Sequence, residues 1–141
     1  GKISINSGNS KDIPEYLPSV PSSNTLDIRF AGLGSHSIEI NDSNLLPGAS
    51  ISLDTLLTED GDEANTLSVS FNSSFMENAS ISANTINLKN TSMFNGTTVT
   101  ASQTITIESS HFVGSSISSQ DRPLQINKSS FIKKTNSKFK F

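Results

Sequence analysis

Cysteine and tryptophan are absent from this chain of 141 residues, which contains only one tyrosine and five prolines. Without cysteine, a disulfide scaffold, a thiolate metal site and a cysteine nucleophile are excluded. Charged residues are also scarce at 16%, the hydrophobic share is 33%, and the net charge is −3. Low apolar content with high net charge is typical of disorder, but here serine, threonine and asparagine supply most of the polarity. This composition indicates a narrow core and a large surface of short, uncharged side chains.

Long hydrophobic runs are missing as well, so the sequence predicts no membrane span. No window places apolar residues at positions i, i+3, i+4 and i+7, which predicts essentially no α-helix. Apolar and polar residues instead alternate, as in TITIE at 104–108 and LQIN at 124–127. This is the side-chain period of a β-strand, and the strand-like positions are rich in isoleucine, valine and threonine, which pack well on a pleated surface.

Three consecutive stretches, starting near residues 72, 90 and 109, repeat one pattern with a period of about 18 or 19 residues. Each stretch has a serine followed two residues later by a phenylalanine, and a fourth such step occurs near the C-terminal end. Side chains at equivalent positions of stacked coils lie on one another, about 4.8 Å apart. The alignment therefore predicts an inward structural ladder of Ser73, Phe75, Ser92, Phe94, Ser110, Phe112, Ser129 and Phe131.

A pair of alternating apolar residues also recurs in every unit. Period and alternation together predict an all-β fold, a right-handed parallel β-helix (β-solenoid) with coils of about 18–19 residues and essentially no α-helix. A lone coil cannot bury its apolar face, so stability has to come from contacts between neighbouring coils. The aligned pairs are Ile38 and Ile40, Leu67 and Val69, Ile86 and Leu88, Ile105 and Ile107, and Leu124 and Ile126.

We expect residues 1–141 to form a single β-helix domain or segment. Residues 1–30, which include three prolines between 7 and 24, form an irregular N-terminal or capping part. Residues 31–71 form coils with an inserted loop at 54–65, and residues 72–141 form regular coils and a C-terminal edge. The alternation of lysine and phenylalanine at 138–141 suits a terminal strand, because lysine discourages edge-to-edge pairing.

The densest charge on the chain is the acidic run Glu59, Asp60, Asp62 and Glu63 in the inserted loop. Calcium prefers several carboxylate oxygens on a flexible loop, so these residues are a candidate calcium site. Their spacing does not match the EF-hand pattern, and the glycine-rich nonapeptide of calcium-binding β-rolls is missing. The favoured interpretation is a solvated loop tip without a bound metal.

The residue between the two members of each apolar pair should face outward, and two of these residues are acidic. If their strands are neighbours, Asp27 and Glu39, with Arg29 close by, would place two carboxyl groups together for acid–base work on a polysaccharide. Paired surface carboxylates also occur without chemistry, and no nucleophile-elbow motif is present. A non-enzyme is therefore expected, with this trio as the alternative. The outward residues are Asp27, Glu39, Ser68, Asn87, Thr106 and Gln125.

The remaining candidate chemistry is sparse. His36 and His111 have no orienting carboxylate in a recognisable triad pattern. Five lysines fall between residues 128 and 140, but without exposed aromatic platforms beside them no nucleic-acid partner is expected. No cofactor is expected either.

Over the coils from 72 to 131, the chain resembles the β-helical exoproteins of Gram-negative bacteria. These are the filamentous-haemagglutinin-like proteins of two-partner secretion and the passenger domains of autotransporters. The resemblance rests on the TITIE and LQIN strands, the Ser-x-Phe steps, and the ISA and VTA segments at 81–83 and 99–101. It implies export through an outer-membrane translocator and roles in adhesion, toxin delivery or aggregation at the cell surface. The N-terminal third departs from the pattern, which leaves pectin-lyase-like and phage-spike β-helices open.

The sequence and the resemblance together lead us to expect a non-catalytic segment of a secreted or cell-surface bacterial virulence protein. It would act as an adhesin or exoprotein scaffold that attaches to a host-surface glycan or matrix protein. Flat polar faces and the loops at 7–24 and 54–65 would carry recognition, since loops on rigid scaffolds commonly do. The alternatives are a polysaccharide-processing β-helix, either a lyase or a hydrolase, and a toxin-type autotransporter passenger.

Overall fold

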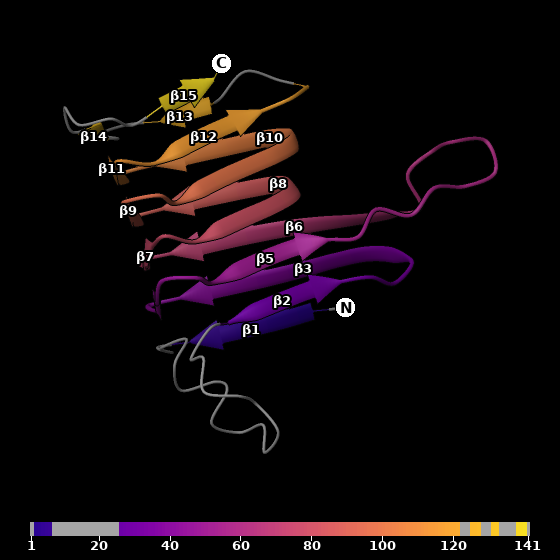
Figure 1. Cartoon of the computed structure of the whole chain (residues 1–141), viewed down its shortest axis with the longest axis horizontal. Helices are drawn as coiled ribbons and strands as arrows, with labels where there is room; N and C mark the ends of the chain where they lie inside the picture. Colours follow the sequence, from indigo (N-terminus) through magenta and orange to yellow (C-terminus); the bar gives the residue numbers. More distant parts are fainter. Residues whose placement is uncertain (1, 7–25, 122–124, 128–130, 133–137, 141) are drawn as a thin grey trace.

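The computed structural model describes residues 2–6, 26–121, 125–127, 131–132 and 138–140 (Figure 1). Within these residues every regular element is a β-strand, so the prediction of an all-β chain without helix is confirmed there. The strands pair in parallel, and the isolated bridge between Leu57 and Glu63 is antiparallel. The predicted irregular stretch at 7–24, Leu124 and Ser129 lie outside the described residues.

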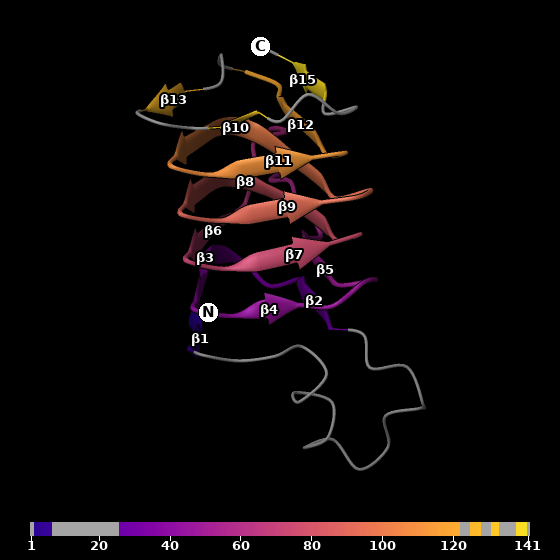
Figure 2. The ribbon, with the colours of Figure 1, turned by 90° about the vertical axis from the view of Figure 1, so that its left-hand side faces the viewer.

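A five-stranded sheet, called the narrow sheet below, covers one face of the molecule (Figure 2). Its strands are two or three residues long and lie in the order β14-β11-β9-β7-β4. They are β4 (Asn44–Leu45), β7 (Phe75–Glu77), β9 (Ser92–Phe94), β11 (His111–Val113) and β14 (Phe131–Ile132).

The ten other strands form the broad sheet, in which seven strands follow the order β1-β3-β6-β8-β10-β12-β15. The strands β2, β5 and β13 pair beside this path. The bounds are β1 (Lys2–Asn6), β2 (Asp27–Phe30), β3 (Gly34–Asn41), β5 (Ser50–Leu53), β6 (Asn65–Asn72), β8 (Ser80–Lys89), β10 (Thr98–Glu108), β12 (Ser116–Ser119), β13 (Gln125–Asn127) and β15 (Lys138–Lys140).

The long strands β8 and β10 belong to two parts of the broad sheet. The first half of β8 pairs with β5 and its second half with β6, while β10 pairs with β12 through its first half and with β13 through its second. We call the part with β2, β5, β12 and β15 the first sector, and the part with β1, β3, β6 and β13 the second sector. The chain therefore passes from the narrow sheet through the first and second sectors and back, as in β7, β8 and β9.

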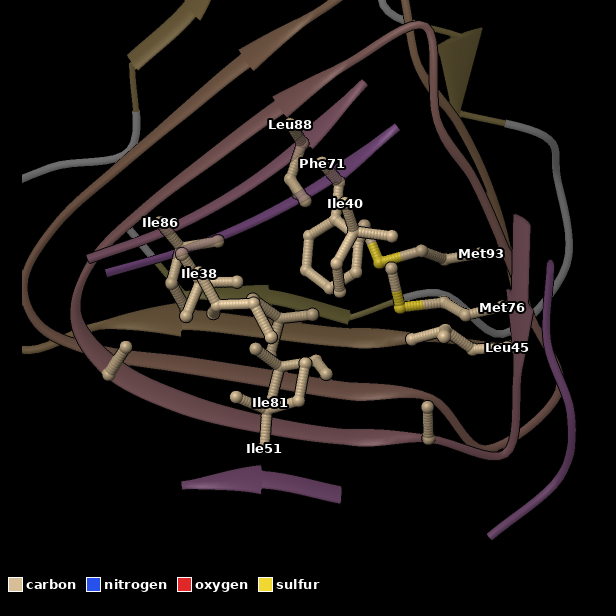
Figure 3. Packing of buried hydrophobic residues seen from close by; sticks show 14 of the residues in the cluster. Ile38, Ile40, Leu45, Ile51, Phe71, Met76, Ile81, Ile86, Leu88 and Met93 are labelled. Atoms are coloured by element: carbon tan, nitrogen blue, oxygen red, sulfur yellow. The ribbon is translucent and has the colours of Figure 1, made fainter. Parts of the chain in front are cut away.

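Side chains from all three surfaces meet in one interior (Figure 3). Parallel pairing places side chains of similar shape next to one another, because each inward residue aligns with its equivalent in the neighbouring strand. Full burial of each large aliphatic side chain contributes about 1.5–3 kcal/mol of transfer free energy. The buried rows are Ile38-Val69-Ile86-Ile105, Ile40-Phe71-Leu88-Ile107, Ile51-Ile81-Val99-Ile117 and Leu45-Met76-Met93-Phe112.

A row of buried hydroxyl groups closes the corner between the second sector and the narrow sheet. Each hydroxyl donates to the carbonyl oxygen two residues earlier, over distances from 2.7 Å in Ser43 to 3.0 Å in Ser110. The backbone N–H groups of Ser43 and Thr91 donate to the hydroxyls of Ser74 and Ser110, both at 3.2 Å. The preceding residues adopt the left-handed backbone conformation, which Asn and Asp tolerate better than most residues. They are Asp42, Ser73, Asn90 and Ser109, with φ of 50°, 50°, 48° and 49°.

The predicted Ser-x-Phe ladder has four units, of which one is right and the other three are wrong in register. Ser110 and Phe112 are buried as predicted, but Phe75 is 37% exposed, and Met76 and Met93 take the inward positions. Both units offer two adjacent apolar residues, and a shift of one residue exchanges the faces of a strand. The buried polar residues there are Ser74 and Thr91, not Ser73 and Ser92, and Phe131 aligns with His111, not Phe112.

The pairing around the insertion also differs from the prediction. Ile38 and Ile40 align with Val69 and Phe71, two residues beyond the predicted Leu67 and Val69. A shift of two residues keeps every side chain on its own face, so the sequence pattern does not reveal it. The chain between β5 and β6 forms a loop that projects from one side of the molecule (Figure 1).

The register of β9 predicts that two adjacent substitutions lower the free energy of unfolding by different amounts. Met93→Asn places an unpartnered amide in the interior and should lower the free energy of unfolding by roughly 3 kcal/mol or more. Phe94→Asn changes an outward side chain and should cost about 1 kcal/mol. Urea unfolding followed by circular dichroism measures both, and a larger loss for Phe94→Asn than for Met93→Asn would restore the Ser-x-Phe register.

Candidate functional site

The outer face of the second sector carries a groove of about 400 Å³ across β3, β6, β8 and β10. Its lining residues are mainly hydroxyl and amide residues with three charged ones, and their polar and apolar atoms share the surface about equally. Only Ile38 and Leu88 contribute apolar residues, and both side chains belong to the interior. The lining residues are Ser37, Ile38, Glu39, Ser68, Ser70, Asn72, Asn87, Leu88, Lys89, Thr106 and Glu108.

The strand pairing arranges this lining in rows. The central row runs through residues that face outward between the two apolar positions of each strand: Glu39, Ser70, Asn87 and Thr106, with Gln125 in register beyond. Of the predicted outward residues, Glu39, Asn87, Thr106 and Gln125 therefore share one row. Ser68 belongs to the adjacent row, because the pairing of β6 lies two residues from the predicted one.

A second row borders the corner with the narrow sheet. Asn72 donates its amide to Asn41, and Asn41 donates to Asn6, both over 2.8 Å. The same row continues from Asn72 to Lys89 and Glu108, which are in register. The groove thus contains one ammonium group and two carboxylates, those of Glu39 and Glu108, among uncharged donors and acceptors.

The proposed acid pair is not assembled. Strand β2, with Asp27, pairs with β5, whereas β3, with Glu39, pairs with β1 and β6. The two residues consequently lie in different sectors of the broad sheet, and their strands do not pair with each other. Arg29 instead contacts Asp54, with its Nε 3.7 Å from Oδ1, and both side chains are more than half exposed. Such an ion pair contributes little to stability.

The acidic residues of the inserted loop do not converge either. The loop closes on itself through two backbone hydrogen bonds. The N–H of Thr58 donates to the carbonyl oxygen of Asp62 over 2.8 Å, and the N–H of Gly61 donates to the carbonyl oxygen of Thr58 over 2.9 Å. Glu59, Asp60 and Asp62 are exposed around this turn. In the described part of the chain, no three His, Asp or Glu side chains gather as a metal-binding group. The calcium candidates are therefore dispersed over a loop tip.

Glu63 has a structural partner at the base of the loop. Its Oε2 accepts a hydrogen bond of 3.1 Å from Asn84, the residue at the bend of β8. The Asn84 amide also donates to Ser102, 3.0 Å, and its oxygen accepts from the N–H of Leu67, 2.8 Å. This buried amide connects the loop with three strands of the broad sheet.

The two histidines occupy different surfaces. A ring nitrogen of His36 lies 2.8 Å from the carbonyl oxygen of Gly32, and its ring packs on Phe30 with centroids 5.3 Å apart. His111 lies in the narrow sheet, in register with Ser92. The structure does not bring these two histidines together.

Two aromatic rings that the sequence interpretation places inside lie on the outer face of the narrow sheet. Phe75 and Phe94 stack with centroids 5.2 Å apart and planes at 30°. In the sequence, the buried hydroxyl residue before each of these strands is ambiguous. Two adjacent hydroxyl residues stand there, Ser73-Ser74 and Thr91-Ser92, and either member could be the buried one. Counting two residues from Ser74 and Thr91 leads to Met76 and Met93, and hence puts the phenylalanines outside.

No family model, no curated protein and no solved structure matches the chain. Among the residues that the structure describes, no helix is long and apolar enough to cross a membrane.

The bend at Asn84 predicts a difference between two asparagines of β8. Asn84→Ala leaves the buried N–H of Leu67 without its acceptor and should lower the free energy of unfolding by about 2 kcal/mol. Asn87→Ala is the matched control, since its amide faces outward and makes a long, 3.5 Å hydrogen bond to Ser70, and a change within about 0.5 kcal/mol is expected. Equal losses in urea unfolding would refute the structural role of Asn84.

Proposed function

We propose that the chain is a non-catalytic segment of a secreted or surface-displayed bacterial adhesin, built as a right-handed parallel β-helix. The parallel pairing and the passage of the chain through three surfaces per repeat support the β-helix. In this fold the narrow sheet and the two sectors are the three faces, and each unit of about 18–19 residues is one coil. Loops and outward side chains can then vary while the interior rows stay the same.

The observation that carries the proposed function is the polar groove on the second sector. Its central row presents one hydrogen-bonding side chain per strand, from Glu39 through Ser70 and Asn87 to Thr106. The spacing between strands is about 4.8 Å, so an extended ligand lying across the strands meets a polar group at every step. A glycan suits this lining. Carboxylates accept hydrogen bonds from sugar hydroxyls, and amides both accept from and donate to them.

The expected affinity of one chain is modest. A hydrogen bond that replaces one to water contributes only about 0.5–1.5 kcal/mol, and the groove has little apolar surface to add to this. Attachment of a cell surface would rely on many copies that bind at once, because linked binding events gain from effective concentration. A scaffold displayed in many copies fits such weak, repeated contacts.

The first experiment is binding of the whole chain to a panel of immobilised glycans and matrix proteins, with the glycans monitored for cleavage. Retention of a glycan without cleavage is the expected outcome. Cleavage would overturn the non-catalytic proposal and favour the polysaccharide-processing alternative. Retention of matrix proteins alone would overturn the glycan as ligand.

The groove itself is tested by Asn87→Ala, which removes an amide from the central row without disturbing the interior. Glycan affinity should fall about twofold to tenfold, the loss expected from one or two hydrogen bonds. Gln103→Ala is the matched control, since this exposed side chain lies at the bend of β10 outside the groove. An equal effect of both substitutions, or of neither, on a glycan that the chain retains would place the binding site elsewhere.

A further inference from the structure

The stacked rings of Phe75 and Phe94 are the most unusual feature of the outer surface. They belong to β7 and β9 of the narrow sheet, the face turned toward the viewer in Figure 2. Phe75 is 37% exposed, and Phe94 is half-buried beside it. A single exposed apolar residue needs no explanation, but two adjacent aromatic rings on a surface of serine, threonine and asparagine do.

The interior does not account for this placement. At the neighbouring inward positions stand Met76 and Met93, both fully buried. In both strands the chain therefore buries the methionine and exposes the phenylalanine, although burial of the phenylalanine would remove more apolar area from water. A diagonal pair of rings also stabilises a sheet of short strands, and this structural role has to be separated from a binding role by experiment.

On β4, β7 and β9 the neighbours of the rings are polar, while Val113 of β11 lies in register with Phe94 on the other side. Glu77 lies directly opposite Phe94 in register, and Ser92 lies opposite Phe75. The Asn95 amide donates to the Glu77 carboxylate over 3.4 Å, a long hydrogen bond that a ligand hydroxyl can replace. The site thus combines an aromatic surface with a carboxylate acceptor and an amide beside it.

This combination matches a ring-shaped ligand with one apolar face and polar groups around its rim, which describes a pyranose sugar. A second copy of the chain is a poorer match, because a stable interface buries about 800 Å² per partner, and Asn44, Glu77 and Ser92 interrupt the apolar surface here. A membrane surface is a poorer match as well, since anionic lipids attract lysine and arginine, whereas the charged group beside the rings is a carboxylate.

We infer that Phe75 and Phe94, together with Glu77 and Asn95, form a sugar-stacking subsite for a neutral pyranoside with an uninterrupted C–H face, of the β-galacto or β-gluco type. The C–H face lies on the exposed ring of Phe75, while the Glu77 carboxylate accepts from the hydroxyls at the rim. The subsite lies on the narrow sheet, across the hydroxyl-lined corner from the groove of the second sector. It goes beyond the proposed function and does not depend on binding in that groove.

The test uses nuclear magnetic resonance of the whole chain with methyl β-D-galactopyranoside and methyl β-D-glucopyranoside as probes. The ring protons of Phe75 and Phe94 should shift on addition of one or both glycosides, and the sugar C–H protons should shift upfield in the ring current. Sorbitol, an open-chain polyol, should leave the ring protons unchanged. Unchanged rings with both glycosides, or equal shifts with sorbitol, would overturn the inference.

Two substitutions separate binding from structure. Phe75→Tyr keeps the aromatic face and should keep sugar binding within about twofold, whereas Phe75→Leu keeps an apolar side chain without a ring and should weaken binding about fivefold to tenfold. Equal binding by Phe75→Tyr and Phe75→Leu, both folded by circular dichroism, would reduce the stack to a structural role and overturn the subsite.

Controls elsewhere on the surface complete the design. Leu57→Ala removes a 63% exposed apolar residue from the inserted loop and should leave the ring shifts unchanged. Asn87→Ala should also leave them unchanged, although it weakens binding in the groove. Loss of the ring shifts in Asn87→Ala would show that the two sites are one, which would overturn a separate subsite on the narrow sheet.

Discussion

The structure depends on one constraint, the in-register stacking of equivalent side chains along parallel strands. Every buried row repeats a residue of similar shape from strand to strand, such as Ile51, Ile81, Val99 and Ile117 in the first sector. Because no single unit has enough apolar surface to form a core, each unit is stabilised by its neighbours. This explains how a chain with only 33% hydrophobic residues has an interior with many fully buried side chains.

The polar corner makes this stacking possible. A chain that turns between sheets exposes backbone groups to the interior, where an unpaired one costs about 1–3 kcal/mol. The hydroxyls of Ser43, Ser74, Thr91 and Ser110 satisfy these groups both within a unit and between units. Small side chains with a donor and an acceptor are required there, which accounts for these four of the many serines and threonines in the chain.

The sequence predicted an all-β fold without helix, because the alternation of apolar and polar residues is a property of neighbouring residues. It did not predict which of two adjacent residues faces inward in β7 and β9. Either orientation of the strand is compatible with the dipeptides Ser73-Ser74, Phe75-Met76 and Met93-Phe94. In the structure, the residue that follows the left-handed position, Ser73 or Asn90, is the buried one. Nor could local pattern reveal that β2 pairs with β5, because the pairing of strands that are distant in the chain is not a property of neighbouring residues. Hence the acid pair was misplaced and the aromatic stack was missed.

The interior explains the methionines but not the outward phenylalanines. Phe71 fills the interior opposite Met76 and Met93, where an unbranched, flexible side chain fits the remaining space (Figure 3). In the following unit, the last inward residue of β10 is Ile107, which is smaller than Phe71, and the inward residue of β11 is Phe112. No such limit applies outside, where Asn44, Ser92 and Glu77 occupy equivalent positions. The rings of Phe75 and Phe94 are therefore a property of the surface, and their cause has to be sought in what that surface contacts.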